Sequence, residues 1–573
     1  MKVELSFYNR YYPWTEISAD GVTCWLKGTF FHENELLSSA DVVHLFSSAL
    51  EDSHIDHDSL KNLLLALNGN FALALETPRY IFCTVDRVRS IPLFYAMNGD
   101  EALFSDDANH LRDRLDPPFN EENGAEFLVT GYVTGPDTLF DGISQLQAGE
   151  YLVYDKRDGT LATHFYHRFW HENYFSDSEE ELLNRLDEVF VRVFQRLIAS
   201  TKGRQIVVPL SGGLDSRIIV AMLKRLGVED VICFTYGKKG SREVEISRQV
   251  AEALEYRWYF VEYTKEKLYD SYHSRAISVY KIYSSNLTSL PHTQDFLAVE
   301  ELKDKGKIHE NAVFVPGHTG DMISGGHIPK GYGHPQIYTF EKFLEDNLKK
   351  HYNLWKWDEP DSLFEDRIRK CIGDFPVYDN ESCANAIELF DFNERQAKFI
   401  VNSVRAYEFL GFQWRIPLWD AESIEFFLRV PVSYRVNQTL YKKYVKKLFS
   451  WQLQSLSEIE CTTDISNDSE GEKTPTLRLL HGLSGIKSIF RILLNYFDSG
   501  WERYYQYPTV TRISNIFGVR YDNPFPKGSL LHKIVQYNQK PLCIMSLGGY
   551  RSKRILSLIK TMRNSREGGL KEH

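Results

Sequence analysis

Residues 206–220 constrain the fold of this chain more than any other segment, because they predict a buried strand, a loop of small residues and the start of a helix. The loop, residues 211–216, reads Ser-Gly-Gly-Leu-Asp-Ser. Glycines let a backbone approach an anion closely, and the first N–H groups of a helix are free to bind it, so we predict a pyrophosphate-binding loop. It differs from a Walker loop because no Lys-Ser/Thr pair follows the glycines. The alternative is an ordinary strand-to-helix turn that contains glycine.

One carboxylate, Asp215, lies within this predicted anion-binding loop. A carboxylate repels polyphosphate unless a divalent cation lies between them, so the loop predicts Mg²⁺ together with a nucleotide such as ATP. The serines at both ends of the loop add hydroxyl donors. The residues expected to bind the nucleotide here are Leu210, Ser211, Gly212, Gly213, Leu214, Asp215 and Ser216.

Residues 313–327 repeat the pattern of strand, glycine-rich loop and helix. Gly317 and Asp321 lie in this second loop, and both are expected at the nucleotide site. Asp321 would be a second metal ligand that, with Asp215, holds Mg²⁺ on the leaving pyrophosphate. Each aspartate taken alone could instead be a helix N-cap. Their positions after two separate buried strands favour the metal site.

The periodic patterns divide the chain of 573 residues into three predicted regions. Residues 1–170 contain short alternating apolar segments separated by turn signals, which predict layered β-sheets. Residues 176–455 alternate strand and helix patterns, which favours a doubly wound parallel α/β sheet with a helical C-terminal part. Residues 456–573 begin with a polar stretch, expected to form a mobile loop, and continue as a basic extension.

Charge and cysteine content exclude several classes of protein. A net charge of −11 argues against general binding to nucleic acid or to acidic membranes. The 7 cysteines are scattered without a CxxC pair, so we expect reduced thiols rather than disulfides or zinc ligands. Neither a signal peptide nor an apolar run of about 18 residues occurs, so we expect a cytoplasmic protein without a membrane anchor.

The loop at residues 211–216 is similar to the pyrophosphate loop of the ATP pyrophosphatases, and its surroundings resemble the synthetase domain of the asparagine synthetase family. Residues 313–327 resemble the family's second motif and keep Gly317 and Asp321. Residues 67–72 and 86–95 resemble the family's glutaminase domain, which implies an Ntn-hydrolase-like αββα fold for the first region. The family uses ATP to adenylate a carboxylate, releases pyrophosphate and lets an amine attack the acyl-adenylate to form an amide.

The glutaminase-like region departs from the family at its reacting residue. The family's nucleophile is a cysteine made N-terminal by removal of the initiator Met, whereas this chain has Lys2 there and no cysteine before Cys24. Residues 26–29 also replace the family's Asn-Gly-Glu turn with Leu-Lys-Gly-Thr. We therefore predict that glutamine hydrolysis is lost, unless another start site exposes a cysteine.

His318 stands where asparagine synthetases carry a Glu and their β-lactam-forming relatives a Tyr, a position linked to the attacking amine. A neutral imidazole can take a proton from an ammonium or amine nucleophile, which makes His318 a candidate catalytic residue. The alternative is that His318 only fills the loop or binds a neighbouring carbonyl. His327 and Met322 replace the family's Tyr and Glu, which weakens the case for strict asparagine synthesis.

Two further pairs of residues are candidates for roles near the nucleotide. Leu210 and Phe234 are placed to flank the adenine base, although packing in the core is an equally good explanation. Residues 413–420 are similar to a third family motif, in which Arg415 and Asp420 are expected to form a structural ion pair beneath the site.

The resemblance also implies a catalytic lysine, because a downstream lysine of the family stabilises the transition state of adenylation or amide formation. Lys443 lies on a basic helix face that is either solvated or able to approach phosphate. Lys473, at the end of the polar loop, is the other candidate.

These observations together predict an ATP-dependent amide-forming ligase that acts on a small-molecule or peptide carboxylate. Its nitrogen would come from free ammonia, from a separate amidase partner or from an amine of the substrate itself, as in the β-lactam and lasso-peptide cyclases that the chain also resembles. The chain could also form a homodimer. A second hypothesis is an inactive family member that serves as a nucleotide-binding or assembly subunit. A third, a tRNA-thiolating branch of the ATP pyrophosphatases, is opposed by the negative charge and the lack of paired cysteines.

Overall fold

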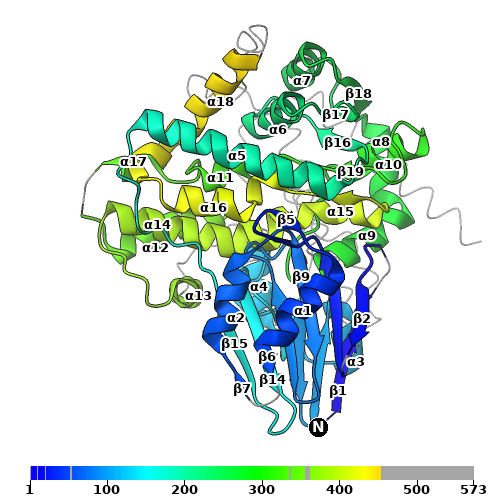
Figure 1. The fold of residues 1–573 in the computed structure, drawn as a ribbon, viewed down its shortest axis with the longest axis vertical. Helices are drawn as coiled ribbons and strands as arrows, with labels where there is room; N and C mark the ends of the chain where they lie inside the picture. Colours follow the sequence, from blue (N-terminus) through cyan, green and yellow to red (C-terminus); the bar gives the residue numbers. More distant parts are fainter. Residues whose placement is uncertain are drawn as a thin grey trace, which may run out of the picture.

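The computed structural model describes residues 2–8, 11–19, 21–51, 54–334, 337–354 and 362–452. The strands of residues 2–165 occupy one half of the molecule, and a parallel sheet surrounded by helices occupies the other (Figure 1). Lys473 and the predicted polar loop and basic extension, residues 456–573, lie outside the described residues.

Two sheets form the centre of the N-terminal half. The first has the order β15-β14-β10-β9-β3-β2, with bounds Leu161–Phe165, Glu150–Asp155, Tyr80–Val85, Phe71–Glu76, Val22–Gly28 and Thr15–Ala19. The second has the order β1-β12-β11-β13, with bounds Lys2–Ser6, Glu101–Ser105, Phe94–Asn98 and Ile143–Gln145. Short strands β4 (Phe31–His32), β5 (Glu35–Leu36), β6 (Leu50–Glu51), β7 (His54–Ile55) and β8 (Leu67–Asn68) pair outside these two sheets.

Helices cover both outer faces of this pair of sheets. α1 (Ser39–Ala49) and α2 (His57–Ala66) pack on the six-stranded sheet, whereas α3 (Ala108–Leu115) packs on the four-stranded sheet and is followed by α4 (Glu121–Thr130). Along β9 the alternation of side chains separates the two cores: Leu73 and Leu75 face the cluster under α1 and α2, and Ala72 and Ala74 face the second sheet. The layered αββα prediction is confirmed.

The sheet of the other half is parallel throughout and has the order β18-β17-β16-β19-β20. Its bounds are Arg257–Glu262, Val231–Gly237, Ile206–Pro209, Val313–Phe314 and Gln413–Trp414. The chain runs outward from β16 to β18 and then crosses back to β19 on the other side of β16, which confirms the doubly wound prediction. In such sheets ligands bind where the strand order reverses, outside the carboxyl ends of the strands, which here is the gap between β16 and β19.

Helices surround this sheet. They are α5 (Glu179–Thr201), α6 (Leu214–Arg225), α7 (Arg242–Ala253), α8 (Lys265–His273), α9 (Arg275–Ser285), α10 (Phe296–Asp304), α11 (Gly320–Ile323), α12 (Phe340–His351), α13 (Ser362–Ile372), α14 (Asn380–Phe390), α15 (Arg405–Phe409), α16 (Ala421–Leu428), α17 (Val432–Arg435) and α18 (Thr439–Gln452). A π-helix, Asp391–Ile400, and a 3-10 helix, Val401–Val404, join α14 to α15 as one helical column. None of the helices described in this structure is long and apolar enough to cross a membrane.

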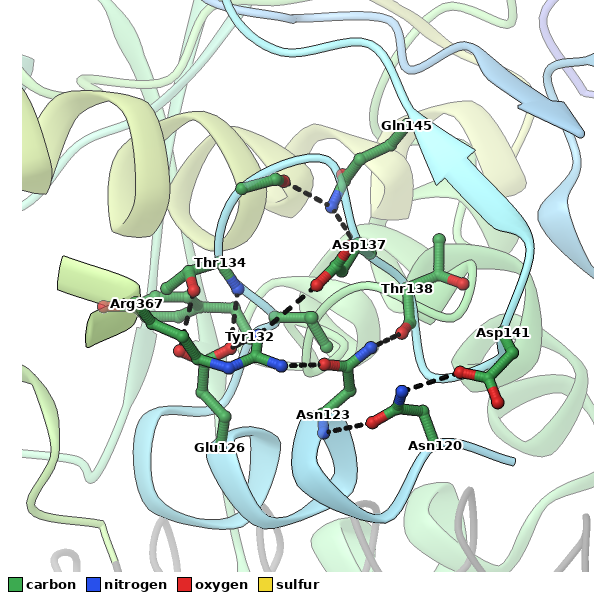
Figure 2. A network of polar contacts seen from close by, with 12 residues as sticks. Asn120, Asn123, Glu126, Tyr132, Thr134, Asp137, Thr138, Asp141, Gln145 and Arg367 are labelled. Carbon is green, nitrogen blue, oxygen red and sulfur yellow. Dashed lines mark hydrogen bonds and ion pairs between the residues drawn. The ribbon is translucent and has the colours of Figure 1, made fainter. Parts of the chain in front are cut away.

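A buried polar network joins the two halves (Figure 2). Glu126 on α4 is fully buried and accepts hydrogen bonds from Thr134 N–H (2.9 Å) and from Arg367 Nη1 on α13 (3.0 Å). Tyr352 donates a further hydrogen bond to it (2.9 Å). A buried carboxylate is stable only when it is paired and hydrogen-bonded, so this network fixes α4 against the helices of the C-terminal half.

Candidate active site

The loop after β16 is held in shape by its two serine hydroxyls. Ser216 Oγ accepts a hydrogen bond from Ser211 N–H (3.0 Å), and the two hydroxyl oxygens lie 3.0 Å apart. Gly213 N–H donates to Ser211 Oγ (3.2 Å), and α6 then begins without a side chain that caps it. The first N–H groups of α6 can therefore donate to an anion, as in phosphate sites at other helix N-termini.

The second loop, which follows β19, lies so close to the first that it needs glycine at two positions. A Cβ at Gly317 would lie 2.7 Å from the backbone nitrogen of Ser216. A Cβ at Gly320 would lie 2.6 Å from the Tyr441 hydroxyl and 2.8 Å from Asp215 Oδ1. These separations are too short for real carbon contacts, so a larger residue at either position would force the two loops apart.

This approach brings the two predicted metal ligands together. Asp321 N–H donates to Asp215 Oδ2 (3.1 Å), and the Tyr441 hydroxyl donates to Asp215 Oδ1 (2.8 Å). Desolvation by the surrounding protein and the negative charge of Asp321 raise the pKa of Asp215 to about 7. Two carboxylates placed in this way favour a proton or a cation between them.

His327 places a positive charge next to this carboxylate pair. Its Nε2 lies 3.4 Å from Asp321 Oδ2, and its Nδ1 lies 2.7 Å from Asp391 Oδ2 on the π-helix. Burial opposes protonation, but the charge of Asp391 and the hydrogen bonds to both carboxylates raise the pKa of His327 to about 9. Lys350 Nζ lies 2.5 Å from the same Asp391 oxygen. Burial alone would raise the pKa of Asp391, but these two cations hold it well below its usual range.

The residues present fit Mg²⁺ bound together with a polyphosphate. Among the residues that the structure describes, no group of three or more His, Cys, Asp or Glu side chains is placed to hold a metal by itself. Mg²⁺ usually takes one or two protein carboxylates and completes its shell with phosphate oxygens and water. Asp215 and Asp321 supply two carboxylates beside an anion-binding loop, which matches that donor set.

His318 follows β19 and lies partly exposed at the same edge of the sheet. Its Nε2 is 2.7 Å from Ser403 Oγ on the helical column. Desolvation lowers the pKa of His318, although the charges of Asp295 and Asp321 oppose this shift. The imidazole is therefore neutral at neutral pH, as its predicted role as a proton acceptor requires; that role stays a prediction.

The other predicted site residues lie in different surroundings. Leu210 and Phe234 are 1% and 0% exposed in the core, where packing accounts for both; contact with a base stays a prediction.

Lys443 Nζ lies 2.5 Å from Glu179 Oε2, at the start of α5. Tyr441, two residues earlier on α18, makes the contact with the loop. Successive helical residues are rotated by about 100°, so Lys443 points to nearly the opposite side of α18 from Tyr441.

The expected ion pair between Arg415 and Asp420 is wrong. Arg415 instead donates to Ser200 Oγ (2.9 Å) and to the Trp414 carbonyl (2.7 Å). Asp420 caps α16, and its carboxylate accepts a hydrogen bond from Arg196 on α5 (2.7 Å). A turn of 3-10 helix, Pro417–Trp419, separates the two residues and directs Asp420 toward α5.

The position of the family's Asn-Gly-Glu turn is occupied by a buried ion pair. Lys27 Nζ lies 3.4 Å from Asp106 Oδ2, which also accepts a hydrogen bond from Trp14 Nε1 (2.7 Å). The side chains of Lys27 and Asp106 are only 5% and 9% exposed. Cys24, the first cysteine of the chain, is fully buried, and burial raises the pKa of its thiol to about 12. A thiol in this environment is a poor nucleophile.

Two residues of the site were missed by sequence reasoning: Tyr441 and Asp391. Tyr441 and Asp391 lie far along the chain from Asp215 and Asp321 and reach them only through the fold. Their signals were available but weak: Tyr441 is a buried, polar-tipped residue of α18, and Asp391 is an acidic residue between two phenylalanines in a helical segment.

Two family models match this chain. The asparagine synthase model matches residues 194–454, and the glutamine amidotransferase domain model matches residues 57–170. The first range contains β16, β19 and both glycine-rich loops. The second begins after the N-terminal strands, so it does not extend over residues 1–56.

Two curated relatives match over part of their length. A probable glutamine-hydrolysing asparagine synthetase of Acanthamoeba polyphaga mimivirus is 35% identical over 96 residues, which are 16% of this chain and 17% of the relative. A putative glutamine-hydrolysing asparagine synthetase 2 of Methanocaldococcus jannaschii is 22% identical over 290 residues, which are 48% of this chain and 53% of the relative. The matched part of the chain thus spans about half the length of the second relative and less of the first.

Solved structures with partial likeness include an NH3-dependent NAD synthetase from Campylobacter jejuni, with 13% identity, a TM-score of 0.18 and coverage of 26% of this chain and 61% of that one. A glutamine phosphoribosylpyrophosphate amidotransferase from B. subtilis has 13% identity, a TM-score of 0.17 and a match that covers 54% of this chain and 58% of that one. Scores this low add nothing to the assignment, which comes from the two family models and the curated relatives. The chain belongs to the asparagine synthetase family, with an N-terminal glutamine amidotransferase-type domain followed by an asparagine synthase domain.

Proposed function

We propose that this protein is an ATP-dependent amide-forming ligase that activates a substrate carboxylate as an acyl-adenylate, releases pyrophosphate and then accepts an attacking amine. The observation that carries the proposal is the contact between Asp215 and Asp321 at the strand-order reversal of the parallel sheet. Two carboxylates beside an uncapped helix N-terminus suit a polyphosphate that arrives with a divalent cation.

The loop at residues 211–216 binds the phosphate groups in this proposal. The N–H groups at the start of α6 donate to the phosphate oxygens, and the Ser211 and Ser216 hydroxyls keep the loop open toward them. Gly317 keeps the second loop against this one, so the anion is held from two sides. Bound Mg²⁺, held by Asp215 and Asp321, would neutralise charge on the leaving pyrophosphate.

The positive charge of His327 stabilises Asp321 in its ionised form. Because Asp391 pairs with His327 on the other side, the imidazolium stays between the two carboxylates. Asp321 can therefore bind Mg²⁺ without first losing a proton. Asp215, whose pKa is about 7, must lose its proton before it can bind the metal.

His318 accepts the proton of the nucleophile in the amide-forming step. An amine must be neutral to attack a carbonyl carbon, and a neutral imidazole at the same edge of the sheet is a suitable acceptor. One N–H bond of the amine breaks, the new C–N bond forms, and AMP leaves with the electron pair of the broken C–O bond.

The nitrogen is proposed to come from free ammonia, from an amine of the substrate or from a separate amidase, rather than from glutamine hydrolysed by this chain. The Lys27–Asp106 ion pair lies where residues 26–29 replace the family's Asn-Gly-Glu turn, and the thiol of Cys24 is buried and protonated. The carboxylate substrate is proposed to be a small molecule or a peptide.

The decisive experiment is exchange of radiolabelled pyrophosphate into ATP, with Mg²⁺ and a panel of carboxylates: L-aspartate, uronic-acid sugars and carboxylated amino acids able to cyclise. Exchange with one of them, lost in Asp321→Asn, would establish adenylation and name the substrate class. Absence of exchange across the panel, together with no rise in melting temperature when Mg²⁺ and ATP are added, would contradict the proposal and favour a non-catalytic subunit.

A further inference from the structure

Asp295 carries a carboxylate that the proposed mechanism does not yet use. It lies at the start of α10 but does not cap that helix. Its Oδ1 instead accepts a hydrogen bond from the Tyr236 hydroxyl (2.5 Å), and its Oδ2 accepts one from the Tyr407 hydroxyl. Tyr236 belongs to the carboxyl end of β17, so Asp295 lies at the same edge of the sheet as the two glycine-rich loops.

No cation neutralises this carboxylate within the described part of the chain, where neither Lys, Arg nor His comes within ion-pair distance of Asp295. Its two partners are phenols, and burial together with the charge of Asp295 raises the pKa of both tyrosines well above their usual range. They therefore stay neutral and donate hydrogen bonds. Asp295 is also partly exposed, so a ligand from solvent can reach it.

The helical column places Asp295 beside His318. Ser403, which contacts His318 Nε2, and Tyr407, which contacts Asp295, are four residues apart in the continuous helical stretch from Val401 to Phe409. Residues four apart lie on one face of a helix, one turn above the other. The charge of Asp295 also acts on His318, where it opposes the effect of desolvation.

The two tyrosines that bind the carboxylate are each stacked on a second aromatic ring. Tyr236 stacks on Tyr263 with ring centres 4.8 Å apart, and Tyr407 stacks on Phe314 with ring centres 4.5 Å apart. Stacking holds both phenols in place, and an anionic carboxylate without a basic partner pairs favourably with an ammonium group. The surroundings of Asp295 thus suit a cation in charge.

We propose that Asp295 binds the nitrogen donor as a cation, either ammonium or a primary alkylammonium group, next to His318. This inference rests on the proposed function and names the form in which the nucleophile enters the site. The bound ammonium then gives one proton to a ring nitrogen of His318: an N–H bond breaks and the imidazole becomes imidazolium. The freed lone pair attacks the acyl carbon, the acyl C–O bond breaks with its electron pair on AMP, and a second N–H proton passes to the phosphate of the departing AMP, which leaves a neutral amide.

The first test uses thallium(I), a monovalent cation close in size to ammonium, soaked into crystals of the full chain. We expect an anomalous peak bonded to Asp295 in the unaltered protein and its loss in Asp295→Asn. Asp304→Asn, an exposed carboxylate at the other end of α10, is the matched control and should keep the peak. No peak at Asp295 in the unaltered protein would overturn the inference, and this measurement does not depend on any variant folding.

The second test separates the inference from the proposed function. In Asp295→Asn, pyrophosphate exchange should continue at the unaltered rate, whereas KM for ammonium chloride in amide formation should rise roughly 10-fold or more, since a charged hydrogen bond is lost. KM for hydroxylamine, which is neutral at about pH 8, should change little in this variant. An unchanged KM for ammonium would overturn the inference even if exchange occurs. If the unaltered protein shows no exchange, the proposed function fails, and the thallium result alone decides the cation site.

Discussion

Tyr441 donates its phenolic hydrogen to Asp215 Oδ1 over 2.8 Å, and this bond ties helix α18 to the glycine-rich loop after β16. Removal of the hydroxyl in Tyr441→Phe leaves Asp215 with one donor fewer, which raises its pKa further and favours a proton over a cation. We expect the affinity for Mg²⁺ and ATP at pH 7 to fall roughly 10-fold, measured by titration calorimetry. Tyr444→Phe is the matched control, because Tyr444 is one turn further along α18 and bonds Asp187. Equal losses in the two variants would contradict a specific role for Tyr441.

His327 should stabilise the folded protein at neutral pH and lose this effect at alkaline pH. Its pKa is about 9 in the folded protein and 6.5 without its partners, so its stabilising charge is complete below about pH 6.5 and is lost as pH rises through 9. The difference in melting temperature between the unaltered protein and His327→Gln should therefore narrow from pH 6.5 to 9.5. His351→Gln is the control, because burial lowers the pKa of His351 to about 3 and the ring stays neutral throughout. A constant difference for His327→Gln would contradict the charge assignment.

Gly317→Ala should destabilise the protein, because the new Cβ would lie 2.7 Å from the backbone nitrogen of Ser216. We expect a loss of about 1–3 kcal/mol in the free energy of unfolding, measured by denaturant titration. Gly213→Ala is the comparison within the site, since its Cβ would meet only Ser211 Oγ, at 3.4 Å. That variant should keep its stability and lose pyrophosphate exchange. Unaltered stability of Gly317→Ala would show that the two loops are not in close contact.

His318 should control the acid side of the pH profile for amide formation. Desolvation holds its pKa below 6.5 despite the charges of Asp295 and Asp321, so the rate should fall only as pH drops below that value. In His318→Gln this acid limb should flatten and the maximal rate should fall, while pyrophosphate exchange continues. The profile is measured with a fixed carboxylate and saturating amine. A limb that persists in the variant would assign His318 a structural role.

The purified protein should release no glutamate from glutamine, with or without ATP. The reason is that Lys27, in the segment that replaces the family's Asn-Gly-Glu turn, forms a buried ion pair with Asp106, and that Cys24 is a buried thiol. Glutamate is measured by an enzyme-coupled assay, with ammonium chloride as the positive control for amide formation. Glutamate release that a cysteine alkylator abolishes would overturn this prediction.

Local patterns predicted much of the fold. The strand, loop and helix at residues 206–220 appear as β16, the serine-linked loop and α6, because a buried apolar run that breaks at two glycines has few other structures available. The layered sheets and the doubly wound sheet followed from alternation with periods of two and of about 3.6 residues. The predicted polar loop and basic extension lie outside the described residues and stay predictions.

The pairing of charges could not be predicted in the same way. Arg415 and Asp420 were expected to pair because both belong to a segment that resembles one family motif, yet Asp420 pairs with Arg196, which lies on α5. Lys443, which was predicted either to be solvated or to approach phosphate, forms an ion pair with Glu179 on α5, and its catalytic role stays a prediction. Charge pairs depend on which side chains meet across elements, and neither sequence distance nor residue type determines that.

The sequence alone determined the family, the two glycine-rich loops and the two aspartates, because these depend on local backbone requirements that only certain residues satisfy. The tertiary structure decided how the loops are used. It placed Tyr441 on Asp215, His327 between Asp321 and Asp391, and the partners of Asp295 and His318, Tyr407 and Ser403, one helical turn apart. These contacts join residues far apart in the chain, and they form only because the parallel sheet and the helical column bring the ends of separate elements to one edge.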